Sequence, residues 1–140
     1  MKRFVTLFLA AMLFVLCVIP CAQAEGAAPR SSNFFCSYGT TLSKEGNGRI
    51  KIVFSTTGLA ICNQLGVASY HVQKRNAEGE WVDVSGLLDG SLGANLTNYT
   101  FSRYFNGVSG ETYRVKVTFL CTINNASEAR NYTSGIITAK

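Results

Sequence analysis

The segment 111–122 alternates between apolar and polar residues except at Glu111 and Leu120, and this alternation constrains the fold more than any other feature. Its apolar positions are Tyr113, Val115, Val117, Phe119 and Cys121. Its polar positions include Arg114, Lys116 and Thr118. Because successive side chains of a strand point to opposite faces, this pattern predicts a strand that buries one face. The segment 49–55 alternates in the same way, with Ile50, Ile52 and Phe54 on its apolar face.

Further short runs rich in Val, Ile, Thr, Tyr and Phe predict additional strands, whereas no stretch keeps a helical period. We expect these strands at 34–43, 67–75, 80–85, 95–105 and 131–139, with Ala68, Tyr70 and Val72 sharing a face. The intervening segments 56–66, 86–94 and 124–130 are expected to be loops. About seven short strands at even spacing predict an all-β, antiparallel β-sandwich.

The first 24 residues have the features of a cleaved signal peptide. Two basic residues precede the apolar run 4–19, and Ala22 and Ala24 supply the small residues that signal peptidase accepts. The run is shorter than the roughly 20 residues that span a bilayer. We therefore expect a secreted protein that begins at Glu25, with a flexible leader at 25–33 and a single domain at 34–140. A lipid anchor at Cys21 is the alternative, although Pro20 stands where a small residue is preferred.

Charge and hydropathy limit the partners of the mature chain. Residues 25–140 hold 11 of the 13 Lys and Arg residues and all 8 Asp and Glu residues, so their net charge is 11 − 8 = +3. The basic residues are scattered, whereas a nucleic-acid site needs a dense basic stripe. No second apolar segment predicts a membrane span after cleavage. We expect no nucleic-acid partner, and instead a cell-envelope component or an extracellular protein.

Two segments resemble a fibronectin type III module. The run 69–72, followed by a polar hairpin and the run 79–84 with Trp81, is similar to the C–C′ hairpin of that fold. The run 110–117 is similar to strand F, and the resemblance implies that the Tyr113 hydroxyl bonds the backbone just upstream. Phe54 stands in the second strand in place of the usual tryptophan. The whole chain also resembles an uncharacterised family of small secreted proteins from Gram-positive anaerobes, which implies no known activity.

Three cysteines remain after signal cleavage: Cys36, Cys62 and Cys121. The fibronectin-like topology implies that Cys62 and Cys121 lie at one pole, where a disulfide can join them. A Cys36–Cys62 bridge, buried reduced thiols, or a disulfide-linked dimer through Cys36 are the alternatives.

The sequence offers little catalytic chemistry. Its single histidine, His71, would have to serve any Cys–His or Ser–His mechanism, but strand alternation places it on the surface, opposite Tyr70 and Val72. There is no Gly-x-Ser-x-Gly elbow, and the His and Cys residues lack metal-site spacing. We therefore expect neither an enzyme nor a bound cofactor or metal.

A non-catalytic extracellular module that binds at or near the cell envelope is the function that the sequence favours, with its ligand unspecified. One alternative is a carbohydrate-binding module, in which Trp81, Tyr99 and Tyr104 stack on sugar rings. Another is a secreted inhibitor or effector polypeptide, with the glycine-rich segment 86–94 as its functional loop.

Overall fold

A computed structural model describes residues 32–140, so the predicted signal peptide and residues 25–31 of the predicted leader lie outside the described residues. The described part folds as one compact unit and contains seven strands. They are β1 (Phe35–Gly46), β2 (Arg49–Arg75), β3 (Trp81–Asp83), β4 (Leu88–Asn106), β5 (Thr112–Ile123), β6 (Ala126–Thr133) and β7 (Ile137–Thr138). All of their pairings are antiparallel, which confirms the predicted all-β class. Within the described residues, no helix is long and apolar enough to cross a membrane.

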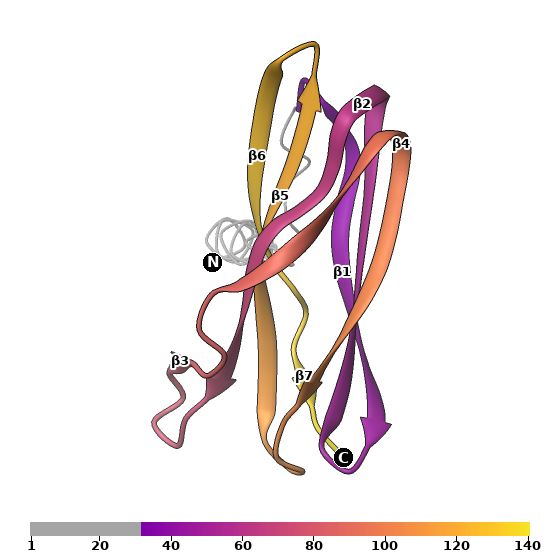
Figure 1. Ribbon diagram of the computed structural model, residues 1–140. Helices are drawn as coiled ribbons and strands as arrows, with labels where there is room; N and C mark the ends of the chain where they lie inside the picture. Colours follow the sequence, from indigo (N-terminus) through magenta and orange to yellow (C-terminus); the bar gives the residue numbers. More distant parts are fainter. Residues whose placement is uncertain (1–31) are drawn as a thin grey trace, which may run out of the picture. The chain divides into compact units, whose positions relative to one another are not determined.

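The 27-residue strand β2 organises the sheet. Its first part, residues 49–58, pairs with β1 and with the second part of β4. Its second part, residues 62–75, pairs with the first part of β4, with β5 and, at its end, with β3. Strands β6 and β7 then pair with β5. Figure 1 shows β2 and β4 as two long curved strands that run beside each other through most of the molecule.

The sheet curls so that its two parts share one core. Phe54 and Tyr70 both lie on β2, yet their ring centroids are 5.0 Å apart. In a straight strand they would be separated by roughly 50 Å, at about 3.3 Å per residue. Tyr38 of β1 and Phe119 of β5 are likewise close, at 5.4 Å. The strand therefore turns back on itself, and aromatic side chains from both parts fill the space between them.

The predicted alternation is confirmed in the two most regular segments. The apolar positions of 49–55 and 111–122 are all buried in the core: Ile50, Ile52, Phe54, Tyr113, Val115, Val117, Phe119 and Cys121. The prediction for Ala68 is wrong, because Ala68 is exposed while Tyr70 and Val72 are buried. The register against β5 shifts between Val67 and Ser69, so a β-bulge turns Ala68 outward.

Three predicted loops are strand in the structure. All of 56–66 lies in β2, the segment 88–94 belongs to β4, and 126–130 begins β6. Their glycine and asparagine content suggested loops, but pairing with neighbouring strands overrides that local preference. Gly90 shows why glycine is needed there: a Cβ at this position would lie 2.1 Å from the Val67 carbonyl oxygen. Gly90 therefore allows close approach of β4 to β2.

Candidate ligand-binding face

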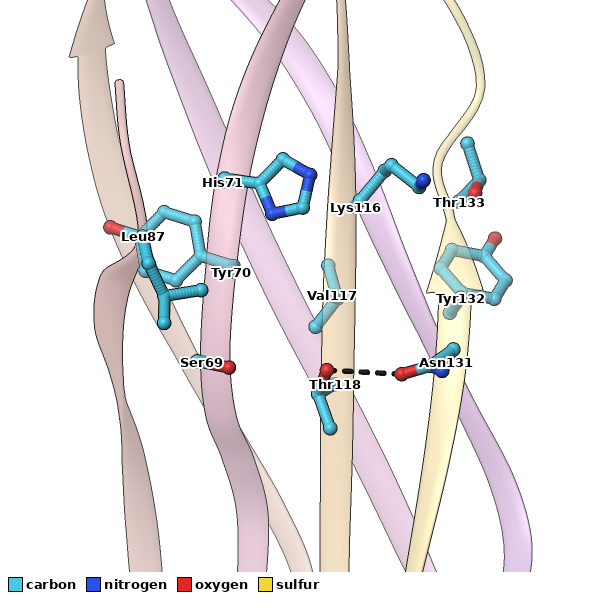
Figure 2. A pocket seen from close by; sticks show the side chains of 10 residues that line it. All are labelled: Ser69, Tyr70, His71, Leu87, Lys116, Val117, Thr118, Asn131, Tyr132 and Thr133. Atoms are coloured by element: carbon cyan, nitrogen blue, oxygen red, sulfur yellow. Dashed lines mark hydrogen bonds between the residues drawn. The ribbon is translucent and has the colours of Figure 1, made fainter. Parts of the chain in front are cut away.

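The outward face of β2, β5 and β6 carries two adjacent rows of polar side chains. Cross-strand pairing aligns the first row, which consists of Ser69, Thr118 and Asn131. The second row, two residues away on each strand, consists of His71, Lys116 and Thr133. These residues line an open groove of about 300 Å³. Figure 2 shows them together with Leu87, which lies at one side. The groove therefore offers hydroxyl, amide, imidazole and ammonium groups on a rigid sheet surface.

The side chains of this groove differ in how firmly they are held. The Thr118 hydroxyl donates a hydrogen bond to Asn131 Oδ1 at 3.0 Å, which fixes the first row. Lys116 is exposed and forms no ion pair within residues 32–140, so its positive charge is available to a ligand. Below the groove, burial raises the pKa of the Tyr70 hydroxyl despite the opposing charge of Arg103. Tyr70 is therefore neutral at physiological pH.

A hydrogen-bonded chain of side chains continues this face toward β3. Arg114 Nε donates to Gln73 Oε1 at 2.8 Å, and Gln73 Nε2 donates to Asp83 Oδ1 at 2.6 Å. His71 Nε2 lies 3.5 Å from the same Asp83 oxygen, so a protonated His71 would form an ion pair there. The Arg114 guanidinium also stacks over the Trp81 ring, 4.3 Å from its centroid. This chain holds the short strand β3 against β2 and β5.

The three aromatic residues proposed for sugar stacking are not brought together. Tyr99 and Tyr104 lie on β4 at positions of opposite parity, so their side chains point to opposite faces of the strand. Tyr99 contacts Phe101 and shares a 2.7 Å hydrogen bond with Ser91, while Arg49 covers the ring of Tyr104. Trp81 lies on β3, where Arg114 occupies one face of its ring. These residues form no common stacking platform.

The structure brings Cys62 and Cys121 together and separates Cys36 from them. Cys62 and Cys121 are fully buried, and their Sγ atoms are 2.9 Å apart with the thiols unbonded. Cys36 is exposed, because the neighbouring Phe35 takes the inward position. Burial, together with the neighbouring Cys62 thiol and the charge of Glu128, raises the pKa of the Cys121 thiol to about 12. The Cys121 thiol is therefore protonated at neutral pH.

Glu128 on β6 fixes the start of β1. Its carboxylate accepts hydrogen bonds from the Ser32 hydroxyl at 3.1 Å and from the amides of Asn33 and Phe34 at 3.1 and 3.0 Å, and it pairs with Arg130. Burial alone would raise the pKa of this carboxyl, but the hydrogen bonds from Arg130 and Ser32 and the charge of Arg130 outweigh it and lower the pKa. Glu128 therefore remains ionised and keeps the strand start in place.

Tyr113 occupies a buried position at the start of β5. Its hydroxyl oxygen accepts a hydrogen bond from the Val108 amide at 2.8 Å, five residues upstream. This is the kind of backbone contact that the fibronectin resemblance implies for a corner tyrosine. Its ring packs edge to face on Phe105, with centroids 5.4 Å apart.

Sequence reasoning missed the groove, although the signal was present. The polar positions of 111–122 define an outward face, but only the β5–β6 register shows that Thr118 lies beside Asn131. Within residues 32–140, no group of three His, Cys, Asp or Glu side chains is placed to hold a metal ion.

Comparison with known proteins yields one weak likeness. No protein-family model and no curated protein matches the chain. A crystal structure of a protein from Archaeoglobus fulgidus is similar over 76% of this chain and 98% of that chain, with 13% sequence identity and a TM-score of 0.41. A likeness of this size supports no statement about function.

Proposed function

We propose that this chain is a secreted, non-catalytic binding module that contacts an anionic cell-envelope component through the groove over β2, β5 and β6. The observation that carries the proposal is the pair of polar rows around an exposed, unpaired Lys116. Such a surface can bind a flexible polymer through several hydrogen bonds and one charge, without a deep pocket.

The charge of this face favours an anionic ligand. Lys116 and His71 lie side by side across β2 and β5, and Arg114 lies on the next row. Two carboxylates border this group: Asp83 lies 3.5 Å from the His71 imidazole, and the exposed Asp89 of β4 pairs with Ser69. Both lie across β2 from Lys116, which is on β5. Phosphate or carboxylate groups of an envelope polymer therefore meet a local positive charge at Lys116.

Co-sedimentation of the purified chain with Gram-positive cell walls tests the proposal. Lys116→Ala is compared with Lys44→Ala, which removes another exposed positive charge, at the β1–β2 end of the sheet. We expect Lys116→Ala to weaken binding by about fivefold, which corresponds to about 1 kcal/mol, and Lys44→Ala to have a much smaller effect. Adding Ser69→Ala should weaken binding further.

The other outcomes distinguish the alternatives. Equal losses in both lysine variants, with complete release by salt, would mean that the positive protein only adheres to an anionic wall. Loss with Trp81→Ala but not with Lys116→Ala would instead support the carbohydrate-binding module. A chain that stays in the supernatant under all conditions would refute the envelope proposal and favour a diffusible inhibitor or effector.

We also propose that the curled sheet is a sandwich of the fibronectin type III kind. Two features support this assignment: the pairing of β1 and β4 with the first part of β2, and the pairing of β4 and β5 with its second part. The Tyr113–Val108 contact supports it as well. Nuclear Overhauser contacts between the Phe54 and Tyr70 rings would be expected, and their absence would contradict a closed sandwich. Membership in the family of small secreted proteins from Gram-positive anaerobes remains part of this proposal.

A further inference from the structure

We propose that Cys62 and Cys121 form a disulfide while the chain folds, before the core closes over them, and that Cys36 remains a free surface thiol. The juxtaposition is specific: β2 and β5 place the two sulfur atoms 2.9 Å apart, and both cysteines are fully buried. The bond would connect Cys62, at the bend of β2, to Cys121, near the end of β5. The two residues are 59 positions apart in the sequence.

The surroundings of the pair are shaped to hold sulfur atoms. A Cβ at Gly58 would lie 2.3 Å from the Cys62 Sγ, so the space beside this sulfur exists because residue 58 has no side chain. The Cys62 thiol donates to the Ala60 carbonyl at 3.4 Å. The Cys121 thiol lies 3.9 Å from the Phe34 carbonyl at the start of β1. The pair therefore lies against the start of β1 as well as within β2 and β5.

The order of events follows from burial. Thiol–disulfide exchange needs a thiolate that can reach an external disulfide. In the folded chain neither sulfur is exposed, and the raised pKa of Cys121 keeps its thiol protonated. Exchange is therefore fast only while the core is still open. Cys36, which is exposed on the outward side of β1, stays accessible throughout.

The reaction balances with oxidised glutathione as the oxidant. The thiolate of one cysteine attacks glutathione disulfide, forms a mixed disulfide and releases one glutathione thiolate. The thiolate of the second cysteine then attacks the protein sulfur of that mixed disulfide and releases the second glutathione. Two protein thiols are oxidised to one disulfide, and one glutathione disulfide is reduced to two glutathione molecules.

Refolding with controlled oxidation tests the proposal. The full chain carries Cys17→Ser and Cys21→Ser, so that three thiols remain. One sample is unfolded in guanidinium and refolded with reduced and oxidised glutathione, and the other is folded under reducing conditions before oxidised glutathione is added. Alkylation after denaturation and peptide mapping by mass spectrometry then identify the bond. We expect Cys62–Cys121 in the refolded sample and oxidation at least about tenfold slower in the prefolded one.

Further variants separate this outcome from a failure to fold. Cys36→Ser should form the same bond, whereas Cys121→Ser should leave all of its thiols open to alkylation after denaturation. Cys36 should react with iodoacetamide in the native protein, and the other two cysteines should not. Three open thiols after oxidative refolding, a bond that includes Cys36, or equally fast oxidation of the prefolded chain would each overturn the proposal.

Discussion

Replacing Tyr113 by phenylalanine isolates the contribution of one buried hydroxyl group. The ring of Tyr113 is 2% exposed and would keep its contact with Phe105, because only the oxygen atom is removed. The Val108 amide would lose its 2.8 Å hydrogen bond. A typical intramolecular hydrogen bond contributes about 1 kcal/mol, and a donor left unpaired costs about 1–3 kcal/mol. Because the Val108 side chain is exposed and water can reach this turn, we expect a loss near the lower end, about 1–2 kcal/mol.

Urea unfolding followed by the fluorescence of Trp81 measures this loss. Tyr132→Phe is the matched control, since Tyr132 also packs against aromatic rings but its hydroxyl makes no hydrogen bond within residues 32–140. The control should change the free energy of unfolding by less than about 0.5 kcal/mol. If the two variants unfold at the same urea concentration with the same slope, the Tyr113 hydroxyl does not stabilise the fold and the argument from the hydrogen bond is wrong.

Three further substitutions test the core, the site of the Cys62 and Cys121 thiols, and the hydrogen bonds of Glu128 to the start of β1. Phe54→Ala should lower the free energy of unfolding by about 3–5 kcal/mol in a urea titration, because it empties a site stacked between two rings. Gly58→Ala should lower the melting temperature through its clash with Cys62, while Gly135→Ala, where the space is open, should not. The pKa of Glu128 is lowered in the folded state, so the ionised carboxylate stabilises the fold at pH values above its ordinary pKa. This stabilisation is lost as the pH falls through the pKa of the folded state. Glu128→Gln should therefore reduce the fall of the urea midpoint with decreasing pH.

Local pattern was sufficient to predict the strands that bury one face. Alternation in 49–55 and 111–122 gave the correct inward residues, because burial on one side of a strand is a local property of the sequence. Pairing between strands that are distant in the sequence is not visible in the local pattern. The segment 56–66 contains two glycines and scattered apolar residues, and it becomes strand because β4 and β5 pair with it. The bulge at Ala68 likewise depends on the register with β5.

The candidate face illustrates the same limit for function. His71 could be placed on the outer surface from parity alone, and it is partly exposed there. Its neighbours could not be identified, since Lys116 and Thr133 are brought beside it by two strand registers. The sugar-stacking hypothesis grouped Tyr99 with Tyr104, although five residues of separation on one strand put them on opposite faces. That parity argument was available from the sequence.

The two ends of the sheet are fastened by different groups, and the groove lies between them. At one end, Glu128 holds the start of β1, and the Cys62 and Cys121 thiols bring β2 and β5 into contact beside it. At the other end, the turn before β5 is held by Tyr113, and the C-terminal segment bonds to the β1–β2 and β4–β5 turns. Strands that are fixed at both ends keep the registers that align the two polar rows. A surface of this kind holds its backbone in one arrangement, which lowers the ordering cost of binding.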